Sequence, residues 1–175
     1  KYGMKSKWRI VPRDYGEYRG KKEFDVEQVC IATNTMPYAD YLICRRFSLI
    51  IESFTNAVFF PLIKLIKEEL NISLFEFVKA VFDNLEQNNN KEYLNTNSTN
   101  NFTKIYSEFS RECEEELFDS KEDIYEFYSK DENYNQLLSS ELGDNLLRKY
   151  STKIICNAFT EAINLSMDLI PDMIA

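Results

Sequence analysis

The chain contains no histidine, and this absence removes several classes of catalytic site. A Ser-His or Cys-His nucleophile pair cannot form within these 175 residues. Four cysteines are present, at positions 30, 44, 113 and 156, and no two of them have the close spacing of a metal-binding pair. The sequence therefore predicts no catalytic residue, no metal site and no cofactor held by this chain alone.

Glycine and proline are also scarce, with four residues of each. The glycines stand apart at positions 3, 16, 20 and 143, which excludes a glycine-rich phosphate-binding loop. Few helix breakers and 44% hydrophobic residues favour a globular, mainly helical protein with a real core.

Charge is unevenly distributed along the chain. The formal net charge of −8 argues against nucleic acid as a partner. Residues 1–22 nevertheless hold eight basic side chains against two acidic ones, whereas residues 108–132 are strongly acidic. These stretches are either two solvated faces, or a basic arm that docks on an acidic partner or on the chain's own acidic helix. Glu112 and Glu116, one helical turn apart, are either a cation site or part of a plain acidic patch.

Two short strands are expected near the beginning of the chain. Residues 7–12 have strand-like composition and should end at Pro12. Residues 24–32 alternate at first and then become wholly apolar, which is typical of a strand with one buried end. Turn-like residues lie between them at 14–17 and 19–22. The predicted fold is mainly α, with this two-stranded β element followed by a bundle of about five to six helices.

The first helix should begin at Pro37, after a Thr-Asn-Thr turn. Its apolar stripe is expected to face the core, so that Phe47→Ala would cost about 3–5 kcal/mol; the stripe comprises Ile43, Phe47, Ile50, Phe54 and Val58. The apolar window 47–66 contains Glu52, Asn56 and Lys64, which favours a buried core helix over a membrane span.

Further along, Ser73 and Glu76 form a capping-box pattern that predicts a helix running to about Glu86. The polar, asparagine-rich stretch 88–101 cannot bury enough apolar surface to offset its ordering entropy, so it predicts a mobile surface loop. The expected division is a β segment at 1–36 and a helical domain at 37–175.

The junction between strand and helix holds the candidate site residues Tyr38, Asp40, Tyr41, Arg45 and Arg46. The two arginines either extend to solvent or pair with Asp40 or Glu52, or one of them projects into a cleft to bind a carboxylate or phosphate. The aromatic and acidic residues follow the end of a strand, where α/β proteins often hold their sites. We interpret these five residues as candidates for the rim of a substrate pocket.

The segments "YGMKSKWRIVPRDYGEY" and "FDVEQVCIATNTMPYADYLICRRFSLIIESF" resemble the region after the catalytic core of cobalamin (B12)-binding radical S-adenosylmethionine proteins. The similarity covers residues 2–54, and Pro37 stands where a serine-type cap is expected. It implies a cytoplasmic, non-catalytic C-terminal accessory domain that covers the substrate pocket of an upstream catalytic domain of the same polypeptide. The β segment would then be the end of that domain's barrel. The [4Fe-4S] cluster, S-adenosylmethionine and cobalamin would belong upstream, because the Cys-x3-Cys-x2-Cys pattern of the family is missing here.

The alternative is a stand-alone α-helical protein-interaction module with the basic and acidic stretches as docking surfaces. The two hypotheses differ in what covers the apolar side of the first strand. A self-contained module should bury it within this chain, whereas an excised piece should leave it bare.

Overall fold

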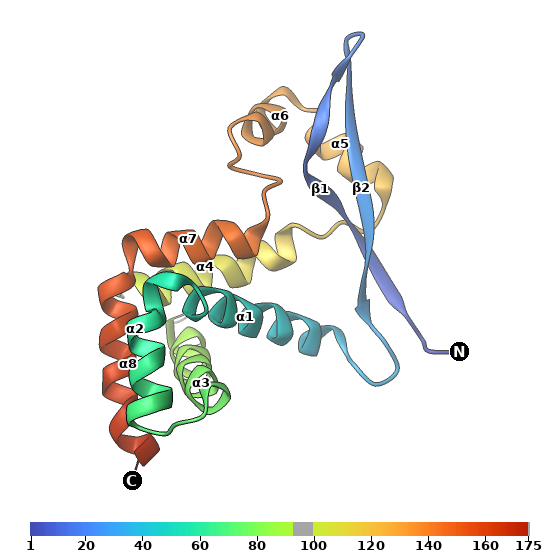
Figure 1. Cartoon of the computed structure of the whole chain (residues 1–175). Helices are drawn as coiled ribbons and strands as arrows, with labels where there is room; N and C mark the ends of the chain where they lie inside the picture. The colour runs from blue at the N-terminus through green and yellow to red at the C-terminus, as the bar shows by residue number, and fades with distance from the viewer. Residues whose placement is uncertain (93–99, 175) are drawn as a thin grey trace. The chain divides into compact units, whose positions relative to one another are not determined.

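The computed structural model of the protein describes residues 1–92 and 100–174, and this part of the chain is mainly α (Figure 1). An antiparallel hairpin comes first, formed by β1 (Lys5–Tyr18) and β2 (Lys21–Ala32). Within the described residues eight α-helices follow, more than the predicted five to six. They are α1 (Tyr38–Phe54), α2 (Phe60–Lys64), α3 (Leu74–Glu92), α4 (Asn101–Glu115), α5 (Lys121–Tyr128), α6 (Asp131–Leu138), α7 (Leu146–Asn157) and α8 (Phe159–Ile174).

Two shorter helical segments connect α1 to α3. The 3-10 segment η1 (Ala57–Phe59) precedes α2, and the π-helical segment η2 (Leu65–Glu69) follows it. Asn56 caps η1 by accepting a hydrogen bond from the backbone N–H of Val58. Pro61 lies at the beginning of α2, where its missing N–H costs no helical hydrogen bond.

The chain forms two compact units, each of which has its own buried core. Unit 1 comprises residues 1–43 and 111–146, and unit 2 comprises residues 44–110 and 147–175. The helices α1, α4 and α7 contribute residues to both units. The division predicted at residue 36 therefore differs from the grouping that the structure shows.

The hairpin of unit 1 is longer than the two predicted short strands. Its turn is the pair Arg19–Gly20, both with positive φ (52° and 75°), which matches the right-handed twist of the flanking strands. Pro12 does not end β1, contrary to the prediction. Pro12 lies between Ile10 and Tyr15, where the hydrogen-bond ladder to β2 is interrupted. The N–H that proline lacks therefore leaves no acceptor on β2 without a partner.

The core of unit 1 lies between the hairpin and two helices. Ile10 of β1 and Phe24 of β2 are only 5% and 3% exposed, and they pack against Ile124, Tyr128, Tyr134 and Leu137 of α5 and α6. Figure 1 shows α5 and α6 beside the two strands. The apolar face of the first strand is thus covered from within the chain.

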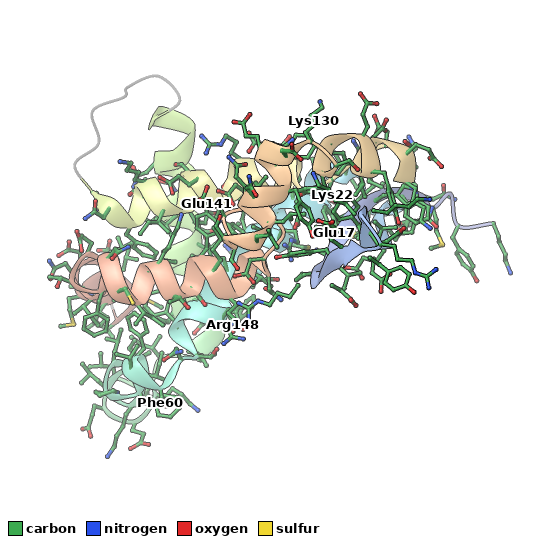
Figure 2. The ribbon with its side chains drawn as sticks, turned by 90° about the horizontal axis from the view of Figure 1, so that it is seen from above. Glu17, Lys22, Phe60, Lys130, Glu141 and Arg148 are labelled. Atoms are coloured by element: carbon green, nitrogen blue, oxygen red, sulfur yellow. The ribbon has the colours of Figure 1, made fainter. Side chains whose placement is uncertain are left out.

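Side chains also tie the hairpin to these helices. The Tyr125 hydroxyl donates to the Phe24 carbonyl at 3.0 Å, and the Tyr15 hydroxyl donates to the Leu137 carbonyl. Lys22 donates to the Ser129 carbonyl at 2.7 Å and pairs with Asp131 at 2.6 Å. Figure 2 labels Lys22 and also Lys130, which stands between Ser129 and Asp131 in the sequence.

Many aromatic residues contribute to the core of unit 2. Phe54 of α1 contacts Phe59 and Phe77, with ring centroids 4.7 and 5.4 Å apart. In unit 2 the buried residues of α1 are Leu49, Ile50, Ser53 and Phe54. The predicted stripe was therefore partly wrong: Ile43 and Val58 are each 40% exposed, and Phe47 lies at the half-buried edge against Phe75 and Phe82. Apolar residues surround much of α1, so periodicity alone does not fix which side is buried.

The predicted mobile loop at 88–101 is wrong at both ends. Residues 88–92 belong to α3, which runs beyond the expected end at Glu86. At the other end Asn100 accepts hydrogen bonds from the N–H groups of Phe102 (2.9 Å) and Thr103 (3.3 Å), and α4 begins at Asn101. An asparagine is a good N-cap residue, so a polar composition there indicates a helix start as readily as a loop. Residues 93–99 lie outside the described residues.

Candidate functional site: an acidic and aromatic cavity in unit 1

Unit 1 contains a cavity of about 360 Å³. Its walls come from β1, the end of α4 and the segment after it, α5, and the segment between α6 and α7. This volume lies near the lower end of the range for ligand pockets, about 300–1,000 Å³. It suits a few side chains rather than a large cofactor.

Acidic side chains outnumber basic ones around the cavity. Arg9 is the basic residue among the lining side chains, against the acids Glu112, Glu115, Glu116, Glu141 and Asp144. Three of the acids recur at positions i, i+3 and i+4 near the carboxyl end of α4, which places them on one face of the helix. Figure 2 labels Glu141, which comes from the segment between α6 and α7. Three of the five acids are paired: Glu115 with Arg111 at 3.4 Å, Glu116 with Arg9 at 3.5 Å and Asp144 with Arg13 at 3.3 Å.

The remaining wall is apolar and aromatic. It is formed mainly by Ile10, Phe118, Phe127, Tyr128, Leu142 and Leu146. Phe118 contacts Phe127 and Tyr128, with ring centroids 5.5 and 5.8 Å apart. The backbone of Phe118 also pairs with Trp8 of β1 through two hydrogen bonds of 2.8 and 2.7 Å, which fixes this aromatic wall to the hairpin.

Local sequence explains why α5 presents its aromatic residues here. Ser120 accepts from the N–H of Asp123 at 3.1 Å, and Asp123 accepts from the N–H of Ser120 at 3.0 Å. This capping box fixes the first turn of α5. Gly143 also lines the cavity, with φ +63°, and an added Cβ there would stand 2.4 Å from a methyl group of Leu137.

Basic residues of the hairpin pair with the acidic segment of the same unit. Arg9 donates to Glu27 at 2.6 Å and lies 3.5 Å from Glu116. Lys7 lies 2.8 Å from Asp119, and Arg13 lies 3.3 Å from Asp144. The interpretation in which the basic arm docks on the chain's own acidic stretch, residues 108–132, is confirmed for Arg9–Glu116 and Lys7–Asp119; Asp144 lies outside that stretch.

Two pKa shifts follow from this arrangement. Burial alone would lower the pKa of Arg9, but the carboxylates of Glu116 and Glu27 outweigh it and raise the pKa. Burial, with a smaller contribution from Glu116 and Tyr15, raises the pKa of Tyr128 to about 12. At neutral pH the cavity thus holds a charged guanidinium and a neutral phenol.

The predicted site residues do not line this cavity. Tyr38 and Tyr41 of unit 1 stack on each other with centroids 6.0 Å apart and planes at 15°. Burial raises the pKa of Tyr38, and Glu114 and Tyr41 add to the effect. Asp40 is exposed in the first turn of α1. Before α1 begins, Thr33 stabilises the preceding turn by accepting a hydrogen bond from the backbone N–H of Met36 at 3.1 Å.

Arg45 and Arg46 belong to unit 2. The Arg45 guanidinium lies 5.9 Å from the centroid of the Phe109 ring. Arg46 binds Glu86 through two hydrogen bonds of 2.7 and 2.9 Å, and the Tyr106 hydroxyl donates to the same carboxylate at 2.6 Å. Arg46 thus pairs with neither of the predicted acids, because α3 brings Glu86 to it from forty residues away.

Sequence reasoning missed most of the cavity. It noticed Glu112 and Glu116 as a pair, but not Phe118, Phe127 or Leu142. The signal available in the sequence was an acidic stretch, including Glu112 and Glu116, followed closely by an aromatic-rich stretch. No pattern of spacing in the sequence indicates that these stretches lie beside β1.

Neither metal sites nor single membrane-crossing helices are found in the part of the chain that the structure describes. No group of three or more histidine, cysteine, aspartate or glutamate residues there could hold a metal ion. No single described helix has the length and apolarity to cross a membrane. One bent pair, Tyr38–Phe54 with Ala57–Glu69 at 65°, meets the length and composition criteria together.

Comparison with protein-family models, with curated proteins and with solved structures found no match for this chain.

Proposed function

We propose that this chain is a protein-interaction module that holds a segment of a partner protein in the unit 1 cavity. The observation that carries the proposal is the burial of Ile10 and Phe24 by α5 and α6. A strand excised from a barrel is expected to leave its apolar face bare. Burial of that face within this chain favours a self-contained module.

The cavity supports the same proposal. Its aromatic wall and acidic side chains offer contact area and charge complementarity, which are the usual means of recognising a peptide segment. The chain has no histidine to pair with a serine or cysteine nucleophile at this site.

Selection of a displayed random-peptide library on the immobilised full chain tests the proposal. We expect peptides that bind the wild-type chain and lose binding to a Leu142→Trp variant, because the larger side chain fills the cavity. Leu138→Trp is the matched control, since Leu138 is exposed and does not line the cavity. Circular dichroism checks that both variants fold. If no peptide of any composition discriminates between the two variants, the proposal is wrong.

The hypothesis of an accessory domain stays a prediction that rests on the resemblance of residues 2–54. It expects Tyr38, Asp40, Tyr41, Arg45 and Arg46 to border the substrate pocket of an upstream catalytic domain, which would hold the [4Fe-4S] cluster, S-adenosylmethionine and cobalamin. Hydrogen exchange of the isolated chain separates it from the module. Rapid exchange of the β1 and β2 amides beside protected helices would favour the accessory domain.

A further inference from the structure

The strand β2 has an outer edge that no other strand covers. In the part of the chain that the structure describes, β2 pairs with β1 alone, as Figure 1 shows. The outer edge of β1 is different, because the backbone of Phe118 pairs there with Trp8 through two hydrogen bonds. An uncovered strand edge presents unpaired N–H and C=O groups that can pair with a strand of another chain. The outer edge of β2 is therefore a candidate interaction surface.

The hydrogen bonds of Trp8 show which residues of β2 face outward. Both backbone groups of Trp8 bond to Phe118, so they point away from β2. In an antiparallel pair the residue opposite then points away as well, and that residue is Gln28. The direction alternates along a strand, and the pairing with β1 is regular from Val26 to Cys30. Val26 and Cys30 therefore also direct their backbone N–H and C=O groups outward.

The two halves of β2 differ in how this edge is protected. Residues 21–25 carry four charged side chains, and the outward carbonyl of Phe24 accepts a hydrogen bond from the Tyr125 hydroxyl at 3.0 Å. Residues 26–30 contain no proline, glycine or lysine, and their one charged side chain, Glu27, already accepts a hydrogen bond of 2.6 Å from an arginine of β1. Charged residues and proline are common means of preventing strand pairing. The edge at 26–30 is thus open to a partner strand.

The open edge is symmetric, and this symmetry indicates its partner. Val26 and Cys30 stand two residues on either side of Gln28. An identical strand that runs antiparallel can therefore pair with all three outward residues at once. A two-fold axis at Gln28 places Gln28 opposite Gln28 and Val26 opposite Cys30, and each opposed pair exchanges two backbone hydrogen bonds. Glu27 then lies opposite Val29, so no charge on the edge faces a like charge.

The two neighbouring registers are less favourable. An axis at Glu27 would place the two Glu27 carboxylates directly opposite each other, and opposed like charges are destabilising. An axis at Val29 would place Val26 opposite Ala32, beyond the point at which the register of β2 with β1 shifts. The ladder is irregular at such a shift, so Val26 would lose its regular partner. The sequence of the edge therefore favours the axis at Gln28.

We propose that two copies of this chain associate through the outer edges of β2, as an antiparallel pair with its two-fold axis at Gln28. The pairing joins the two hairpins into a four-stranded sheet with β1 on each outer side. A contact of five residues from each copy is small beside stable interfaces, which use about 20–30 residues a side, so the dimer dissociates on dilution. The residues of this edge do not line the cavity, and the dimer therefore does not depend on the proposed function.

Sedimentation velocity of the full chain from about 1 μM to about 1 mM tests the proposal. We expect the average mass to rise with concentration from that of one copy toward that of two. A reducing agent is present throughout, because Cys44 and Cys156 are exposed and would otherwise form disulfides on oxidation. A chain that stays monomeric over this range, or that forms species larger than a dimer, would overturn the proposal.

Charge at Gln28 tests the register of the pair. Gln28→Lys and Gln28→Glu each place like charges opposite each other across the axis, and each should weaken the dimer about fivefold. The two changes shift the net charge of −8 in opposite directions, so a loss that both share does not come from overall repulsion. An equal mixture of the two variants should associate about as tightly as the wild type, because lysine then faces glutamate.

Ser6→Ala is the matched control. Any substitution of Gln28 disturbs the hydrogen bond of 2.6 Å that its side chain donates to the Ser6 hydroxyl. Ser6→Ala removes the same bond and leaves β2 unchanged, so this variant should dimerise as the wild type does. Both positions are exposed, and thermal unfolding checks that each variant is folded. If Gln28→Lys associates as tightly as the wild type, or the mixture no more tightly than its components, the proposal is wrong.

Discussion

Tyr128 shows how burial of a single residue links this fold to pH. Its ring is 4% exposed and forms part of both the unit 1 core and the cavity wall. Its pKa is raised from the ordinary value of about 10 to about 12. A phenol that must stay neutral in the folded protein makes stability depend on pH in the alkaline range.

We predict that the free energy of unfolding falls as the pH rises from about 10 to about 12. Below pH 10 the phenol is protonated in both states, so its contribution is fully present. Above pH 10 the unfolded chain releases the proton while the folded chain keeps it, which lowers stability by up to about 1.4 kcal/mol per pH unit. Urea unfolding across this range should show a shallower decline for Tyr128→Phe than for the wild type. Equal slopes would contradict the prediction.

The contact of Arg46 with Glu86 and Tyr106 is the second residue-scale feature. The Tyr106 side chain is fully buried, and the side chains of Arg46 and Glu86 are 16% and 25% exposed. Burial, the hydrogen bond to Glu86 and the charge of Glu86 raise the pKa of Tyr106. This network joins α1, α3 and α4 within unit 2.

We predict that Arg46→Ala destabilises the protein by roughly 2–3 kcal/mol, because it leaves a largely buried carboxylate with one partner fewer. Tyr106→Phe should cost about 1–2 kcal/mol, since Glu86 keeps both hydrogen bonds from Arg46. Lys79→Ala is the control on α3, and it should cost less than about 1 kcal/mol because the Lys79–Asp83 pair is exposed. Urea unfolding gives the three values. If Arg46→Ala costs no more than Lys79→Ala, Arg46 extends to solvent as the sequence also allowed.

At the scale of elements, α1 carries the largest difference between sequence and structure. Of the inward stripe predicted from the sequence, Ile50 and Phe54 are buried, whereas Ile43 and Val58 are exposed and Leu49, outside the stripe, is buried. Apolar residues three and four apart lie on more than one side of α1, so spacing alone does not identify the buried side. Packing against the rings of Phe59 and Phe77 decides between them.

We predict that Phe54→Ala costs about 3–5 kcal/mol, since its ring is fully buried among other aromatic rings. Ile43→Ala should cost less than about 1 kcal/mol because Ile43 is an exposed side chain. Phe47→Ala should fall between these two, below the 3–5 kcal/mol expected from the sequence. Denaturant unfolding midpoints at equal m-values check this order. A cost for Ile43→Ala that equals the cost for Phe54→Ala would show that Ile43 is also part of the inward stripe, as the sequence predicted.

At the scale of the whole molecule, two separate cores divide the chain. Phe24 and Ile124 belong to unit 1, and Phe54 and Phe77 belong to unit 2. Each unit combines segments that are far apart in the sequence. A core substitution should therefore act first on the unit that contains it.

We predict that Phe24→Ala raises hydrogen exchange in β1, β2, α5 and α6 more than in α3 and α8. The substitution leaves a cavity among Tyr125, Tyr128 and Tyr134, whose rings lie 5.3 to 6.1 Å from Phe24. Mass spectrometry of exchanged peptides gives the comparison, and Phe54→Ala supplies the reverse case. A uniform rise along the chain in both variants would show that the two cores unfold together.

The sequence determined much of the local structure. The Arg19–Gly20 turn, the Thr33 turn and the helix starts after Pro37 and Ser73 all follow from short-range patterns of backbone preference. Scarcity of glycine and proline likewise indicated a mainly helical protein. Such features depend on residues within one or two turns of each other, so the sequence displays their causes directly.

Only the tertiary structure decided the partners of these elements. The cavity joins Arg9 of β1 to Glu116, Phe127 and Leu142, which stand more than a hundred residues further along the chain. Glu86 reaches Arg46 in the same way, by way of a helix that the sequence predicted but could not orient. Hydrophobic burial is non-directional, and many pairings of the same elements would bury similar area. Side-chain packing in three dimensions selects one of these pairings, and the periodicity of apolar residues along the chain does not reveal which one.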